Sequence, residues 1–154
     1  MYFVYSDWIG GVYATPSFPG SRSGFASAGA WYALTHYGRK QYKENAIRVS
    51  EATKRAARDL SKINGVKVFG EPKLCALGFN TTTVDCYAVS EHLGKRGWKI
   101  AAIHHPRGMH LSVTPSNCTE IGENLAKDVA EIVAELEKNP PAKKGETAQL
   151  YGAS

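Results

Sequence analysis

The stretch WIGGVYATPSFPGSRSG, residues 8–24, lies near the start of the chain and organises the fold that we expect. Its glycines and prolines argue against a helix or a central strand, because proline lacks an amide donor and glycine is costly to order. Its aromatic side chains, Trp8, Tyr13 and Phe18, argue against a free linker. We therefore expect an ordered loop. Its Gly and Ser amides with Arg22 beside them could cradle an anionic group, and a packed connector with a surface arginine is the alternative.

Length and composition describe an ordinary globular protein. A chain of 154 residues suits one domain with a core, or one piece of a larger protein, and 43% of its residues are apolar. No run approaches the ~20 apolar residues of a membrane span, and the N-terminus lacks a signal pattern. Three widely spaced cysteines, Cys75, Cys86 and Cys118, fit neither a disulfide framework nor a zinc site. We expect buried thiols in a reducing, cytoplasmic compartment, with no membrane span in this chain.

The net charge of +5 is concentrated in residues 39–62, which hold eight basic and three acidic side chains. Such a segment could attract nucleic acid or an anionic membrane. The alternative is a solvated helix face. No aromatic-studded strand or recognition helix accompanies the segment, so we expect no nucleic-acid partner.

The remaining pattern predicts strands and helices in a definite order. We expect a strand or extended arm at 1–9, a buried helix from Gly24 to Tyr37 that stops at Gly38, and a helix over 40–63. Strands follow at 66–69 and 74–79, then a helix over 84–95 capped by Thr81–Thr83. Strands at 98–104 and 109–114 precede a last helix, with a capping box of Asn117 and Glu120 at its start and Pro140-Pro141 at its end. This order predicts an α+β sandwich on a small, mainly antiparallel sheet.

Few other residues suggest chemistry. His104, His105 and His110 surround a Pro-Arg-Gly turn without a carboxylate or cysteine at ligand spacing, so we expect no metal site. No nucleophile elbow, P-loop or dinucleotide fingerprint occurs. The glycine pair Gly10-Gly11 and the run Gly20-Ser21-Arg22 are the features that point to binding.

These two motifs resemble a segment of the sphingosine-1-phosphate lyase family. There the family typically reads D-W-x-G-G-x-Y-x-S-P-T-x-A-G-S-R-P-G, and this chain has DWIGGVYATPSFPGSRSG at residues 7–24. The likeness continues through residues 30–34, 38–42, 69–72 and 93–98, the His110 strand and the closing 150–152. Departures are Thr15 for Ser, Ser17 for Thr, Pro19 for Ala and Ser23 for Pro.

The resemblance implies a pyridoxal 5'-phosphate (PLP) enzyme of the aspartate-aminotransferase-like fold type I, working as a homodimer. The reaction would cleave a phosphorylated sphingoid base into a long-chain aldehyde and phosphoethanolamine. Residues 1–38 would end the PLP-binding large domain, 39–141 would form the C-terminal small domain, and 142–154 a polar tail. Tyr13 would line the substrate channel. Ser17, Gly20, Ser21 and Arg22 would lie at or near a phosphate or cofactor pocket.

The family's Schiff-base lysine follows a histidine, and no His-Lys pair occurs in this chain. The resemblance therefore places that lysine upstream of Met1, with no catalytic residue in this chain, and we expect the chain alone to be inactive. Two alternatives remain, namely a related PLP-dependent amino-acid decarboxylase and a non-catalytic binding or oligomerisation module. Full-length eukaryotic relatives are typically tethered to the endoplasmic reticulum, which nothing in this sequence would do.

Overall fold

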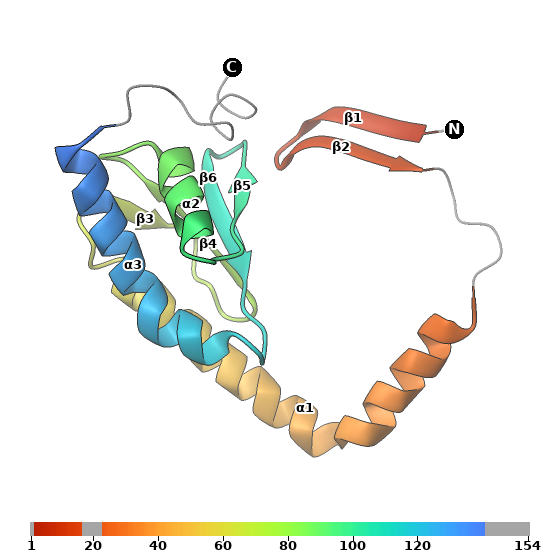
Figure 1. Cartoon of the computed structure of the whole chain (residues 1–154). Helices are drawn as coiled ribbons and strands as arrows, with labels where there is room; N and C mark the ends of the chain where they lie inside the picture. The colour runs from red at the N-terminus through yellow and green to blue at the C-terminus, as the bar shows by residue number, and fades with distance from the viewer. Residues whose placement is uncertain (1, 17–22, 141–154) are drawn as a thin grey trace.

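The computed structural model describes residues 2–16 and 23–140, which form a β-hairpin, a long broken helix and a four-stranded α+β unit (Figure 1). The hairpin pairs β1 (Tyr2–Trp8) with β2 (Gly11–Pro16) in antiparallel register, Tyr5 facing Tyr13. The expectation of a strand at the start of the chain is confirmed. The expectation of a loop is wrong for the first part of the 8–24 stretch. Val12, Tyr13 and Thr15 favour a strand, and Pro16 stands at its end, where it interrupts no central ladder.

Helix α1 (Phe25–Leu60) joins the two helices expected from the sequence. Gly38 interrupts it with φ 63° and ψ 172°, a left-handed conformation that glycine adopts without steric cost. The break at Gly38 is confirmed, but the expected burial of the segment before it is wrong. Trp31, Leu34 and Tyr37 are all more than half exposed among the described residues. Small side chains permit close packing there, yet the described chain supplies no element to pack against them.

The second sheet is antiparallel throughout, in the order β3-β4-β6-β5, with β3 (Val66–Val68), β4 (Ala76–Thr81), β5 (Ala101–Ile103) and β6 (Gly108–Ser112). The strand expected at 74–79 corresponds to β4, and its expected central position is confirmed because β4 lies between β3 and β6. One face of the sheet is buried through Leu77, Phe79, Met109 and Leu111. That face shares a single core with α1, α2 (Cys86–Lys95) and α3 (Cys118–Lys138), which confirms the α+β expectation.

The two long helices bury the stripes that their periodicity predicts. The stripe of α1 is buried at Val49, Ala56 and Leu60, with Ala52 and Ile63 partly buried. That of α3 consists of Ile121, Leu125, Val129, Ile132, Val133 and Leu136, all buried. A Cβ on Gly122 would lie 3.5 Å from the Cα of Ala52, so the two helices approach closely at this glycine.

Helix starts differ from the expected caps. Asp85, rather than Thr81–Thr83, caps α2, since its side chain accepts a hydrogen bond from the Tyr87 amide at 2.9 Å. Asn117 precedes α3 as expected, but the capping box with Glu120 is wrong. Asn117 Oδ1 accepts a hydrogen bond from the Thr114 amide at 2.7 Å, and Asn117 Nδ2 donates one to the Ser112 carbonyl at 3.1 Å. The side chain thus ties the helix to the end of β6.

Two of the three thiols are buried as expected, Cys86 and Cys118, whereas Cys75 is exposed. Cys75 precedes β4 on an irregular segment that the core does not cover. No described helix has the length and apolar character needed to cross a membrane. Pro141 and the tail at 142–154 lie outside the described residues.

Candidate functional site

The predicted site begins on the hairpin, whose turn explains the glycine pair. Gly11 has φ 102°, which a side-chain-bearing residue adopts only with strain. A Cβ on Gly10 would lie 2.7 Å from the Trp8 indole nitrogen, so the ring lies over the turn. The pair therefore permits both a tight reversal and close contact with an aromatic ring.

The hairpin turn contacts the four-stranded unit through backbone groups. The amides of His104 and His105 donate to the Ile9 carbonyl at 2.7 and 3.0 Å. Both residues directly follow β5. The two hydrogen bonds position the hairpin against this end of the sheet.

Tyr13 lies on β2 with 52% of its surface exposed. Its neighbours on the hairpin are similarly exposed, namely Phe3, Val4, Tyr5, Trp8, Ile9 and Val12. The other predicted binding residues, Ser17, Gly20, Ser21 and Arg22, lie outside the described residues. The structure therefore places Tyr13 alone among them, and the grouping of the five stays a prediction.

Helix α1 begins at Phe25, which follows residues 20–24 (GSRSG) in the sequence. Ser23 accepts a hydrogen bond from the Phe25 amide at 3.2 Å. Along the first part of the helix the rings of Tyr32 and His36 stack at 5.1 Å between centroids, and Tyr37 meets His36 edge-on at 5.4 Å. Like the hairpin, this segment exposes aromatic side chains to solvent.

The described residues around Tyr13 form no enclosed cofactor pocket. Tyr13 is half exposed, and the described residues that surround it are apolar or aromatic rather than phosphate-binding. That arrangement fits PLP held between this chain and further protein. It does not fit PLP held by the described residues alone.

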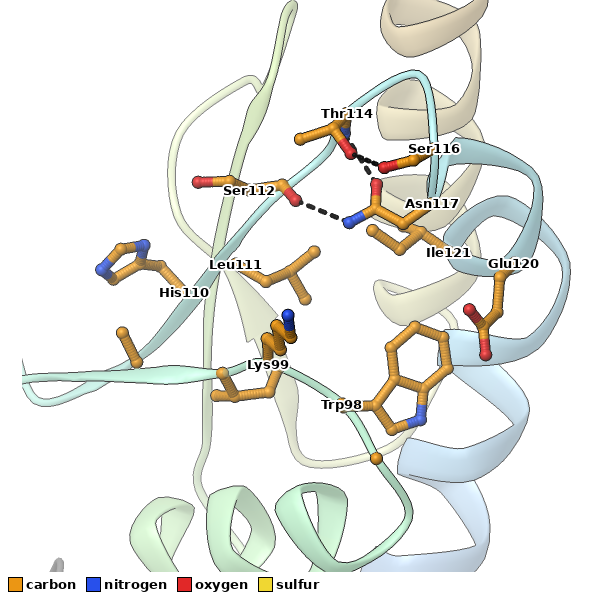
Figure 2. A pocket seen from close by; sticks show the side chains of 13 residues that line it. Trp98, Lys99, His110, Leu111, Ser112, Thr114, Ser116, Asn117, Glu120 and Ile121 are labelled. Atoms are coloured by element: carbon orange, nitrogen blue, oxygen red, sulfur yellow. Dashed lines mark hydrogen bonds between the residues drawn. The ribbon is translucent and has the colours of Figure 1, made fainter.

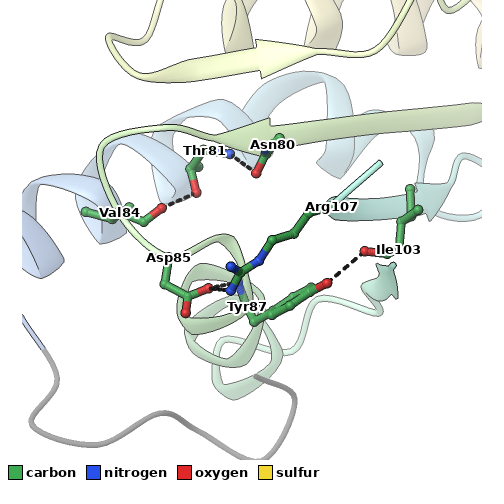
Figure 3. Close-up of polar contacts among 7 residues, drawn as sticks. All are labelled: Asn80, Thr81, Val84, Asp85, Tyr87, Ile103 and Arg107. Atoms are coloured by element: carbon green, nitrogen blue, oxygen red, sulfur yellow. Dashed lines mark hydrogen bonds and ion pairs between the residues drawn. The ribbon is translucent and has the colours of Figure 1, made fainter. Parts of the chain in front are cut away.

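Apart from the hairpin, a polar cluster lies at the β5–β6 turn, where Arg107 contacts Asp85 and Tyr87 at the start of α2 (Figure 3). Its Nη2 donates to Asp85 Oδ1 at 2.9 Å, and its guanidinium carbon lies 4.6 Å from the Tyr87 ring centroid. The Tyr87 hydroxyl donates to the Ile103 carbonyl at 3.0 Å. Burial raises the pKa of both Tyr87 and the Cys86 thiol. Sequence analysis predicted only a turn at this place. Because the Arg107 guanidinium and the Tyr87 hydroxyl both have partners within the fold, we assign the cluster a structural role.

A cavity of about 650 Å³ opens between β5, β6 and the start of α3 (Figure 2). Polar side chains that line it include Lys99, His110, Ser112, Asn117 and Glu120. His110 is exposed and faces away from the core, between Gly78 and Ala101 on the adjacent strands. Sequence reasoning weighed His110 only as a metal ligand. Within residues 2–16 and 23–140, no three His, Cys, Asp or Glu side chains are grouped to hold a metal ion.

The chain is similar in sequence to curated sphingosine-1-phosphate lyases, although it matches no protein-family model. It is 34% identical over 149 residues to the protein of Oryza sativa subsp. japonica, and 36% identical over 159 residues to that of Dictyostelium discoideum. It is 32% identical over 152 residues to sphingosine-1-phosphate lyase 1 of Mus musculus. These matches cover 97%, 100% and 98% of this chain but only 28%, 29% and 27% of the relatives, so the chain spans less than a third of their length.

Solved structures show a similar relation. The Burkholderia pseudomallei sphingosine-1-phosphate lyase matches 89% of this chain with a TM-score of 0.70 and 31% identity, over 31% of its own chain. A C-DES mutant with glycine covalently linked to its PLP cofactor matches 76% of this chain, over 30% of its own, with a TM-score of 0.53. Its 13% identity shows likeness of fold alone. The fold is that of a portion of fold type I PLP enzymes, as the resemblance implied.

Proposed function

We propose, from the homology of this chain to one portion of the sphingosine-1-phosphate lyases, that it forms the C-terminal part of a PLP-dependent lyase of that kind. One observation carries the proposal: a solved lyase matches 89% of the chain with 31% identity and a TM-score of 0.70. The curated relatives of the same name match it from end to end. The substrate would be a phosphorylated sphingoid base, and the products a long-chain aldehyde and phosphoethanolamine. PLP would supply the electron sink for the C–C cleavage.

The proposed site combines the hairpin with the loop that follows it. Tyr13 would lie along the substrate channel, where its exposed ring offers apolar contact and a hydroxyl. The amides and hydroxyls of Ser17, Gly20 and Ser21 would hold an anionic oxygen, and Arg22 would bind it with a bidentate guanidinium. Helix α1 begins three residues after Arg22 in the sequence, and its N-terminus would add a partial positive charge.

The domain boundary that we propose falls at Gly38. Residues before it would complete a PLP-binding large domain, and the exposed aromatic surface of the hairpin and α1 would be buried there. Residues 39–141 would form the small domain, with 142–154 as a polar tail. We further propose that the enzyme is a homodimer whose site works on the cytosolic side of the membrane, as the family resemblance implies.

The direct test is the reaction of the full-length protein that carries this chain. With PLP and sphingosine-1-phosphate we expect release of phosphoethanolamine and a long-chain aldehyde, both measured by mass spectrometry. Release of carbon dioxide from glutamate or an aromatic amino acid, with the lipid left intact, would instead identify a decarboxylase. Absence of both reactions would leave a binding module and would overturn the proposal.

A further inference from the structure

We propose that the second half of α1 docks the enzyme on an anionic membrane through a basic face. We define the basic face as Lys54, Arg55 and Arg58, three exposed cations, together with Arg48 and Lys43 along the same helix. The preference for a membrane rests in part on the proposed function, because the substrate would be a lipid with an apolar chain and an anionic headgroup.

Lys54, Arg55 and Arg58 of the basic face have no part in packing the core, whereas Arg48 donates a hydrogen bond to Cys118 Sγ at 3.7 Å. Positions in α1 that enter the core are Val49, Thr53, Ala56 and Leu60, at spacings of three and four. At 100° per residue, Lys54, Arg55 and Arg58 project from the other side of the helix. Their charges are therefore not needed to form the fold.

Nor does the basic face form an ion pair within the described chain, although Lys62 and, less strongly, Arg55 and Arg58 lower the pKa of Asp59. Of the acidic residues on this helix segment, Glu44 lies 4.0 Å from Lys40 and Asp59 2.7 Å from Lys62. No described carboxylate lies within ion-pair distance of Lys54, Arg55 or Arg58. By contrast, each of the two arginines that brace the fold has a carboxylate partner: Arg96 pairs with Asp128 and Glu131, and Arg107 with Asp85.

The surface beside the basic face has room for headgroups. A cavity of about 470 Å³ runs between α1 and α3. Its charged lining consists of Arg48, Glu51, Arg55, Arg58 and Glu123, three cations against two carboxylates. A lipid phosphate that enters it would meet a net positive charge.

Two features favour a membrane over nucleic acid. Residues 43–62 contain no aromatic side chain, so bases would find no ring to stack on. Ile47, on the outer side of the same helix, is 46% exposed and offers an apolar contact to the acyl boundary. Because the apolar stripe of α1 is buried in the core, the contact with the bilayer would be mainly electrostatic, with Ile47 as its apolar part.

The test is co-sedimentation of the full-length protein with phosphatidylcholine vesicles that contain or lack phosphatidylserine, at low and high salt. The variant carries Lys54→Gln, Arg55→Gln and Arg58→Gln. A matched control carries Lys67→Gln, Lys95→Gln and Lys138→Gln, three exposed lysines on other elements that also lose three charges. Each cation at a membrane surface contributes about five-fold to binding, so we expect the first variant to partition about 100-fold less and the control to stay near wild type.

Binding to neutral vesicles as strong as to anionic ones, equal losses in both variants, or no vesicle binding would overturn the proposal. So would tight binding of an RNA or DNA oligonucleotide that the first variant abolishes while vesicle binding persists. Turnover of a water-soluble, short-chain phosphorylated substrate should be unchanged by the first variant. If no variant turns over any such substrate, the proposed function fails, while the vesicle result still decides the docking proposal.

Discussion

Arg22 stands in the run Gly20-Ser21-Arg22, three residues before the start of α1. Its proposed partner is a phosphate or carboxylate, which a planar guanidinium binds through two parallel hydrogen bonds. We predict that Arg22→Ala in the full-length enzyme lowers kcat/KM by about 100-fold, with little change in thermal stability. Arg39→Ala, at an exposed arginine of α1, is the control and should retain wild-type turnover. Equal activity of the two variants would show that Arg22 has no role in the site.

The three cysteines differ in environment and should differ in reactivity. Cys86 is buried, and desolvation raises its thiol pKa, although the nearby Arg107 charge opposes the shift. Since the thiolate is the reactive form, a raised pKa leaves less of it at neutral pH, and the fraction grows as pH rises. We predict that iodoacetamide labels the exposed Cys75 first and Cys86 and Cys118 only slowly until the protein is denatured. Peptide mapping by mass spectrometry would measure each site. Rapid labelling of Cys86 at neutral pH would contradict its burial.

Among the elements, the β5–β6 hairpin has little tolerance for added volume at Gly108. A Cβ on Gly108 would lie 2.6 Å from the Phe69 ring and 2.9 Å from the Phe79 carbonyl oxygen, and the backbone oxygen cannot move away. We predict that Gly108→Ala lowers the free energy of unfolding by about 1 to 3 kcal/mol. Gly94→Ala, in a helix with no atom within 4 Å of the new Cβ, should be neutral or stabilising. Urea unfolding of both variants would measure the difference, and equal midpoints would refute the packing of Phe69.

Helices α2 and α3 are tied together by Asp128. Its two oxygens accept from the Trp98 indole at 2.7 Å and from Arg96 at 2.8 Å. We predict that Asp128→Ala costs about 1 to 2 kcal/mol, because the half-buried indole N–H loses its acceptor. Asp128→Asn should cost less, since the amide oxygen can still accept one bond. Glu131→Ala, which removes a more exposed partner of Arg96, should have the smallest effect. The reverse order of unfolding midpoints would contradict this account.

Sequence patterns predicted the helices and strands better than they predicted which other elements pack against them. The periodicity of α3 located six of its seven buried residues, all but Cys118, because an amphipathic stripe depends on the helix alone. The prediction that the helix around Trp31 is buried was wrong. Small residues indicate that another element can pack closely against a helix, but they do not say whether that element belongs to the same chain. Asp85 was missed as a cap because three threonines stood nearby with the same capping chemistry. Of the candidate site, the family resemblance put Tyr13 in a substrate channel, and the structure shows its ring half exposed on β2. The loop with Arg22 lies outside the described residues, so its role stays a prediction from the motif.

Exposed apolar surface is unevenly distributed over the described part of the chain. The four-stranded unit has a complete core, whereas the hairpin and the first half of α1 expose Trp8, Trp31 and Phe25. The curated relatives that the chain matches are more than three times as long. A chain that contributes a finished small domain and one wall of a larger site would have this distribution of exposed apolar surface.

We propose that this chain completes a PLP enzyme whose Schiff-base lysine lies in another part of the polypeptide. The most direct measurement is reduction of the full-length holoenzyme with borohydride, followed by intact mass and peptide mapping. We predict one pyridoxyl adduct on a lysine outside these 154 residues. An adduct on a lysine of this chain, or no adduct on a protein purified with PLP, would contradict the account.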